Sequence, residues 1–205
     1  MKFITGVLFG LFLSGAVVAI VLATGSYDVA ATKPPSKWET KIATFALNRS
    51  VSKRAPRGGN PMPATPEVLK AGLDHYRENC VTCHGAPGVD ASEIGEGLNP
   101  PAPDLTLPRV QSRPPAEMFW IVSNGIRSTG MPAFGPTHDS NEIWKIVTFL
   151  KHLPEVGTEE QKILKAGTEE ADHHHEEKSA PAAETMPSPP ATPHDHPPGT
   201  PPHKH

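Results

Sequence analysis

The amino-acid sequence predicts an all-α protein: an N-terminal transmembrane helix, a small domain of three to four helices, and a disordered C-terminal tail. Three observations support this prediction. The chain begins with a long uncharged segment, its middle shows helical spacing of apolar residues without sustained strand alternation, and its end is rich in proline, histidine and acidic residues. The 205 residues carry a formal net charge of −3, which does not indicate a nucleic-acid-binding protein.

The first segment, residues 1–24, contains an uncharged run over residues 3–23 that comes after Lys2. About 20 apolar residues cross a bilayer as a helix, whereas the apolar core of a signal peptide has roughly 7–15. Length therefore favours an uncleaved anchor, although Val21-Leu22-Ala23 offers a cleavage site for the alternative, a signal peptide. Both interpretations place the rest of the chain outside the cytoplasm. By the positive-inside rule, however, the lysines that follow the run would place this flank in the cytoplasm.

A basic connector is expected over residues 25–61. Ser36 and Glu39 form a potential capping box, which predicts a short amphipathic helix over about 37–52. Its apolar residues at helical spacing are Trp38, Ile42, Phe45 and Ala46. Two interpretations stay open: a spacer helix resting on the domain or on lipid headgroups, or a docking surface for an acidic partner.

The compact domain is expected over residues 62–153. Thr65-Pro66-Glu67 has the cap, proline and acid of a helix start, and this helix should reach about Cys80. Further helices are expected over 115–124 and from Asp139 or Ser140 to just before Pro154. Residues 85–113 are rich in glycine and proline and are predicted to form a loop. A loop of this length in a small domain needs something to pack on.

Residues 154–205 are predicted to be a disordered tail, because large apolar residues are almost absent after Leu164. Clustered histidines in this tail are candidate ligands for copper, nickel or zinc, and the alternative is a solvated tail without a metal. The candidates are His173, His174, His175, His194, His196, His203 and His205.

The chain has two cysteines, Cys80 and Cys83, and His84 comes directly after the second. A disulfide between them would close a very small loop, a thioredoxin-like pair would need a βαβ unit, and zinc would need further ligands. Cys-x-x-Cys-His is instead typical of haem c attachment, with two thioether bonds and the histidine on the iron. A covalently bound haem would also give the loop over residues 85–113 an apolar surface. Haem c is attached outside the cytoplasm, which outweighs the lysine bias.

Residues 66–153 resemble a class I monohaem c-type cytochrome, in the haem motif, in the Gly130-Met131-Pro132 loop and in both terminal helices. The resemblance implies a small all-α cytochrome c fold around one covalently bound haem, with His84 and Met131 as axial ligands. Met118, inside a predicted helix, is the rival ligand but suits the core, and Met62 is a poor candidate.

The resemblance also implies that a proline-bearing loop holds the second ring nitrogen of His84, and Pro101 in the segment 99–103 is the expected residue. It implies that the terminal helices cross closely at Gly72. The residues Arg109, Arg113 and Trp120 are candidate partners of the haem propionates, or else simple surface and core residues.

With both axial positions filled, an electron carrier is expected and not an enzyme, since no substrate can reach the iron. The expected place is the periplasmic face of a bacterial inner membrane on a single-pass anchor, with a soluble periplasmic form after cleavage as the alternative. The expected partners are respiratory-chain proteins, and the protein is either free or a subunit of their complex. The alternative functions are a haem enzyme or gas or peroxide sensor with an open iron, and metal handling by the histidine tail.

Overall fold

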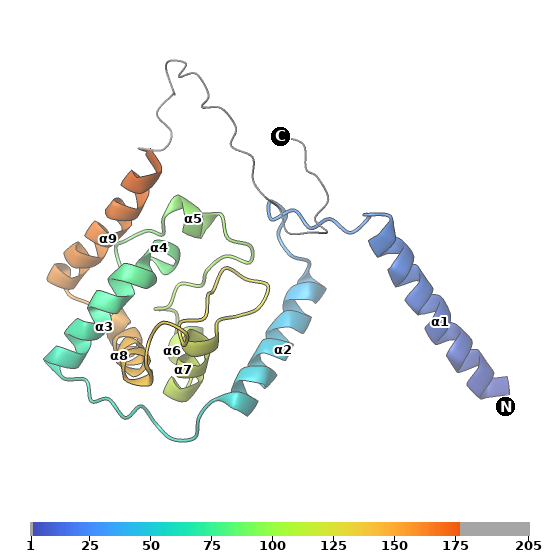
Figure 1. The fold of residues 1–205 in the computed structure, drawn as a ribbon, viewed down its shortest axis with the longest axis horizontal. Helices are drawn as coiled ribbons and strands as arrows, with labels where there is room; N and C mark the ends of the chain where they lie inside the picture. Colours follow the sequence, from blue (N-terminus) through green and yellow to red (C-terminus); the bar gives the residue numbers. More distant parts are fainter. Residues whose placement is uncertain (1, 177–205) are drawn as a thin grey trace, which may run out of the picture.

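The structure, a computed structural model, describes residues 2–176, and its regular elements are helices joined by loops (Figure 1). No strand occurs in this part of the chain, so the all-α prediction is confirmed. The helices are α1 (Lys2–Ala23), α2 (Lys37–Arg54), α3 (Pro66–Asn79), α4 (Val81–His84), α5 (Glu93–Glu96), α6 (Pro108–Gln111), α7 (Pro115–Asn124), α8 (Ser140–His152), the 3₁₀ turn η1 (Leu153–Glu155) and α9 (Thr158–Glu176).

Helix α1 stands away from the other helices in Figure 1. Its span Phe3–Ala23 has a mean hydropathy of 2.5, and none of it is buried against the rest of the protein. At about 1.5 Å per residue the helix is roughly 33 Å long, which matches the hydrocarbon core of a bilayer. The protein therefore has one N-terminal helix that is long and apolar enough to cross a membrane, a property that signal sequences share.

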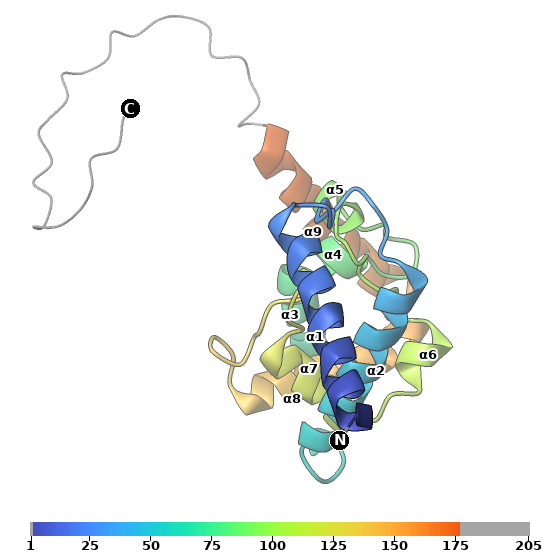
Figure 2. The same cartoon turned by 90° about the vertical axis from the view of Figure 1, so that its right-hand side faces the viewer.

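The core of the domain forms where α3 crosses α8, and Figure 2 shows α7 packed beside α8. A Cβ atom placed on Gly72 would lie 2.5 Å from the carbonyl oxygen of Lys145 and 2.6 Å from Cβ of Phe149. The helices approach this closely because Gly72 has no side chain. Tyr76 packs on Phe149 with ring centroids 5.5 Å apart, and both residues are fully buried. The predicted close crossing at Gly72 is confirmed.

Local capping explains where the predicted helices begin. The hydroxyl of Thr65 accepts a hydrogen bond from the backbone N–H of Val68 at the start of α3. Asp139 and Glu142 form a capping box at α8. Ser36 and Glu39 form the predicted capping box at α2.

The expected start of the disordered tail at residue 154 is wrong for the first part of that segment. Residues Thr158–Glu176 form α9, which packs against α3 and α4. Leu164 is 0% exposed, and Nε2 of His152 on α8 lies 3.4 Å from Oε1 of Glu160 on α9. Leu164 and Thr168, the buried side chains described on α9, hold this helix to the domain despite its polar composition. Residues 177–205 lie outside the described residues.

Candidate haem site

The Cys-x-x-Cys-His motif forms a single helical turn at the end of α3. The carbonyl of Cys80 accepts hydrogen bonds from the backbone N–H groups of Cys83, at 3.1 Å, and His84, at 2.9 Å. The same residue caps α3 by donating its own N–H to the carbonyl of Tyr76 at 2.9 Å. Both cysteines are free thiols, with Cys80 buried and Cys83 half-buried. The turn therefore gathers two thiols and an imidazole at the end of a packed helix.

The two thiols are uncharged at neutral pH in this setting. Burial raises the pKa of Cys80 to about 12, with a smaller contribution from the neighbouring Cys83. Burial also raises the pKa of Cys83. Reactive redox cysteines need a lowered pKa, so the environment does not favour redox chemistry at these thiols. It suits neutral sulfur, as in a thioether.

His84 is held in one tautomer by the loop on the C-terminal side of the motif. Its Nδ1 lies 2.9 Å from the carbonyl oxygen of Pro103, and because a carbonyl can only accept, Nδ1 must carry a proton. Burial lowers the pKa of His84, and the hydrogen bond to Pro103 opposes this shift only in part. A neutral imidazole with Nδ1 protonated has its lone pair on Nε2, the form that binds a metal.

The carbonyl that holds His84 belongs to a different proline from the expected one. Pro101 was predicted for this role, and the structure has the carbonyl of Pro103 in that place. The segment 99–103 was the right one. Which proline in such a run faces the imidazole depends on the path of the loop, which local sequence does not determine.

Tyr76 supports the motif from α3, a contact that the sequence did not predict. Its hydroxyl donates a hydrogen bond of 2.6 Å to the carbonyl of Gly85, the residue after His84, and the side chain is fully buried. The spacing of nine residues between donor and acceptor obeys no helical or turn rule. This hydrogen bond fixes the chain on the C-terminal side of His84.

The loop that bears Met131 folds back on the end of α7. The backbone N–H of Ile126 donates to the carbonyl of Met131 at 3.1 Å. The hydroxyl of Thr129 accepts from the N–H of Met131, at 3.1 Å, and donates to the carbonyl of Ile126, at 2.8 Å. Met131 is half-buried against the hydrophobic core. This compact turn gives the thioether a defined position.

The other methionines lie in different settings. Met118 is 4% exposed and belongs to the core on α7, as expected for a residue inside that helix. Met62 is half-buried and precedes α3. Of the two expected ligand candidates in the domain, Met131 lies on a loop and Met118 on a helix.

The loops of the two expected ligands touch one another. A Cβ atom on Gly130 would lie 2.5 Å from Cδ2 of Leu98, so the Met131 loop packs directly on the segment that leads to Pro103. Figure 1 shows these two loops side by side between α4 and α2. The structure thus brings the loop that supports His84 and the loop that carries Met131 together.

The residues present fit a haem bound through the motif. The donor set is two neutral sulfurs, an imidazole with a free Nε2 and a thioether, and the loops beyond His84 carry half-buried apolar side chains that pack on the core. These apolar side chains are Leu105, Met131 and Phe134. Among residues 3–168, whose side chains the structure describes, no group of three or more His, Cys, Asp or Glu side chains could hold a metal ion instead.

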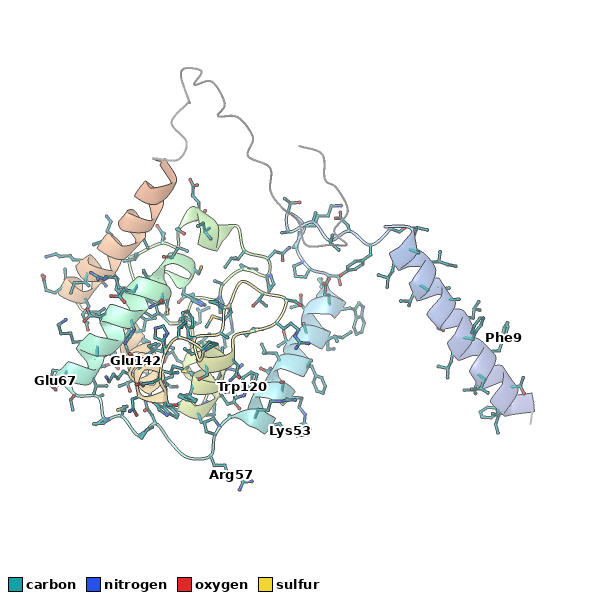
Figure 3. All side chains as sticks on the ribbon, viewed as in Figure 1. Phe9, Lys53, Arg57, Glu67, Trp120 and Glu142 are labelled. Carbon is teal, nitrogen blue, oxygen red and sulfur yellow. The ribbon has the colours of Figure 1, made fainter. Side chains whose placement is uncertain are left out.

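The candidate propionate partners have different surroundings. Arg113 forms an ion pair of 2.7 Å with Glu117 and a hydrogen bond of 2.9 Å to the side-chain oxygen of Asn48, so it joins α7 to α2. Arg109 is exposed, and Trp120 is half-buried on α7 (Figure 3). The structure therefore gives Arg113 a structural role.

The candidate ligands of the tail are not placed by the structure. His194, His196, His203 and His205 lie outside the described residues. His173, His174 and His175 fall in the last part of α9, where the backbone alone is described. Metal binding by this tail stays a prediction.

The fold, the motif and a family match support a c-type cytochrome domain with one haem motif, and such a domain supports haem-based electron transfer. Residues 67–150, less than half of the chain, match the family model described as cytochrome C oxidase, cbb3-type, subunit III. The match begins in α3 and ends in α8, so it contains the haem motif and the Met131 loop. No curated protein matches the chain.

Proposed function

We propose that the protein is a membrane-tethered monohaem cytochrome c that passes single electrons between respiratory-chain partners. One haem would be held covalently by Cys80 and Cys83, and His84 and Met131 would bind its iron. The contact between Gly130 and Leu98 carries this proposal, because it joins the loop of one ligand to the loop that supports the other. With both ligands supplied by the chain, no position is left for a substrate.

Each residue of the site has a separate part in this function. The carbonyl of Pro103 fixes the ring of His84 and makes Nε2 a stronger donor. A Met131 thioether favours the reduced state and raises the potential, and the apolar side chains exclude water. When bound, the haem supplies a one-electron couple, while the chain sets its potential.

The proposed location is the periplasmic face of a bacterial inner membrane, with α1 as a single-pass anchor. The apolar length of α1 supports this proposal, and so does the need to attach haem c outside the cytoplasm. Cleavage after α1 would give a soluble periplasmic carrier. The matched family description names an oxidase subunit, which supports a donor, acceptor or parent complex of the respiratory oxidase class.

The test is the absorption spectrum of the oxidised, haem-loaded protein beside two methionine variants. We expect a weak far-red Met-to-iron charge-transfer band in the parent, its loss in Met131→Ala, and its retention in Met118→Leu, which keeps the volume of a core residue. A band that survives in Met131→Ala would contradict the ligand assignment. A high-spin parent whose spectrum shifts with added cyanide would favour the haem enzyme or sensor.

The metal hypothesis for the tail has a separate test. Because α9 is packed on the domain, the deletion that tests it should remove residues 177–205 and leave α9 in place. If metal binding and electron transfer are both unchanged by this deletion, the tail beyond α9 has no part in either.

A further inference from the structure

Exposed apolar side chains gather on the connector and on α2. Outside α1, seven large hydrophobic residues are exposed among the described residues, and five of them fall within residues 27–45. The seven are Tyr27, Val29, Trp38, Ile42, Phe45, Ile94 and Ile163. Isolated exposed hydrophobics are ordinary, but this concentration in one short segment is not.

Three of these side chains form one stripe along α2. Trp38, Ile42 and Phe45 are 73%, 65% and 68% exposed, and their spacing of four and three residues puts them on the same side of the helix. Val51, which is fully buried, lies about 150° around the helix from this stripe at 3.6 residues per turn. The stripe therefore faces away from the domain.

The same helix is fastened to the domain on its other side. Val51 belongs to the buried residues of the protein, and Asn48 accepts a hydrogen bond of 2.9 Å from Arg113, which lies just before α7. These contacts account for the burial of one side of α2. They leave the stripe of Trp38, Ile42 and Phe45 uncovered in the described part of the protein.

Basic side chains border the stripe, and together they make what we call the basic aromatic face. This face consists of Trp38, Lys41, Ile42, Phe45, Arg49 and Lys53. Nζ of Lys41 lies 5.5 Å from the ring of Trp38. The one acidic residue of α2, Glu39, is occupied by the capping box and accepts a hydrogen bond of 3.2 Å from the hydroxyl of Tyr27.

The connector ties this face to both α1 and the haem site. Thirteen residues separate Ala23 from Lys37, so α2 begins within about 45 Å of the end of α1 even in a fully extended chain. The side-chain amide of Asn99 donates to the carbonyls of Ala31, at 2.8 Å, and Lys33, at 2.6 Å. Asn99 begins the segment that ends at Pro103, the partner of His84. The connector thus fixes α2 relative to the haem ligand.

We propose that α2 lies in the headgroup region of the membrane that α1 crosses, with the basic aromatic face against anionic phospholipids. A helix with aromatic residues on one side and Lys or Arg beside them is typical of the membrane interface, where the basic side chains extend to lipid phosphates. The inference rests on the proposed anchor, because α1 brings α2 to the bilayer. Contact at α2 would hold the haem domain in one orientation above the membrane.

An acidic protein partner fits these observations less well. Lysine is depleted at protein interfaces relative to the rest of the surface, whereas Lys41 and Lys53 both belong to this face. Continuity with a helix able to span the bilayer also favours the lipid. Binding of the basic aromatic face to a second copy of this chain or to an acidic protein is therefore treated as an alternative outcome of the test.

The experiment uses the full-length, haem-loaded protein in nanodiscs of phosphatidylcholine, with and without phosphatidylglycerol. A nitroxide label replaces Phe45 through Phe45→Cys, and the matched control is Ala43→Cys, an exposed position on the same helix about 130° from the stripe. Paramagnetic resonance then measures collision of each label with oxygen, which concentrates in lipid, and with a nickel chelate, which stays in water.

We expect the label at 45, but not the label at 43, to gain oxygen contact and lose chelate contact in the phosphatidylglycerol discs. The double variant Lys41→Gln, Lys53→Gln should lower the equilibrium constant for this docking about 30-fold, from the contribution of two basic side chains near an anionic surface.

Three results would overturn the inference. The label at 45 could keep full contact with the chelate in every disc, or could lose that contact equally in discs without phosphatidylglycerol. It could also lose chelate contact in lipid-free protein as the protein concentration rises, which would identify a second copy of the chain as the partner. If the protein stays with the discs and keeps its reduced and oxidised spectra in these cases, the proposed anchored carrier is not contradicted.

Discussion

Replacement of Gly125 by alanine should displace the Met131 loop from the haem site. Gly125 ends α7 with φ of 64° and ψ of −170°, a conformation that is nearly restricted to glycine. An added Cβ would lie 2.7 Å from the carbonyl oxygen of Met131 and 2.8 Å from the backbone nitrogen of Ala133. Backbone atoms cannot rotate away as a side-chain end can, so the whole loop must move.

Two separate costs set the expected loss of stability. Placing alanine in this backbone conformation costs about 1–3 kcal/mol. Overpacking against atoms that cannot yield typically adds about 1–3 kcal/mol. We expect Gly125→Ala to lower the free energy of unfolding by about 2–6 kcal/mol, with a weakened far-red band because the displaced loop holds the Met131 sulfur less well.

Gly88 provides the matched control. It also has a positive φ, of 74°, but the nearest atom to its added Cβ is a side-chain oxygen of Gln161 at 3.8 Å. Gly88→Ala should therefore cost about 1–2 kcal/mol from backbone strain and leave the far-red band unchanged. Denaturant unfolding of the haem-loaded proteins, followed by absorbance, compares the two. Equal losses of stability with an intact band in both variants would show that Gly125 does not position the Met131 loop.

Three further variants test other parts of the structure. Tyr76→Phe leaves the buried carbonyl of Gly85 without its hydrogen bond and should lower the free energy of unfolding by about 1–2 kcal/mol. An unchanged denaturant midpoint would contradict a stabilising role for this hydrogen bond. Leu164→Ala should cost about 2–5 kcal/mol if α9 is docked, whereas Ile163→Ala, at a more exposed neighbour, should have a much smaller effect; equal effects would mean that α9 is not docked. Hydrogen bonds from the first turn of α8 lower the pKa of Asp139. The contribution of Asp139 to folding stability is therefore complete above the ordinary aspartate pKa and is lost as pH falls through the lowered value. The difference in denaturation midpoint between the parent and Asp139→Ala should shrink in acid, and a constant difference would be incompatible with this cap.

Features that depend on neighbours in sequence were predictable. The caps at Ser36, Thr65 and Asp139 are local, and each begins a helix where expected. The Cys-x-x-Cys-His turn is local too, because one turn of helix brings all three side chains together. The crossing at Gly72 was expected from the resemblance rather than from local rules.

Features that depend on distant parts of the chain were missed. The choice of Pro103 over Pro101 depends on the path of a loop that packs on Gly130. The docking of α9 depends on buried positions such as Leu164 within a segment whose overall composition resembles a disordered tail. The hydrogen bonds from Asn99 to the connector join residues more than sixty positions apart. No local pattern of residues encodes such contacts.

The proposed carrier requires an iron with no open position, and carbon monoxide added to the reduced, haem-loaded protein probes that position. We predict that the reduced spectrum of the parent stays unchanged under carbon monoxide, while Met131→Ala shows the shift of a bound gas. A shift in the parent equal to that of Met131→Ala would contradict the proposed carrier and identify an open haem site.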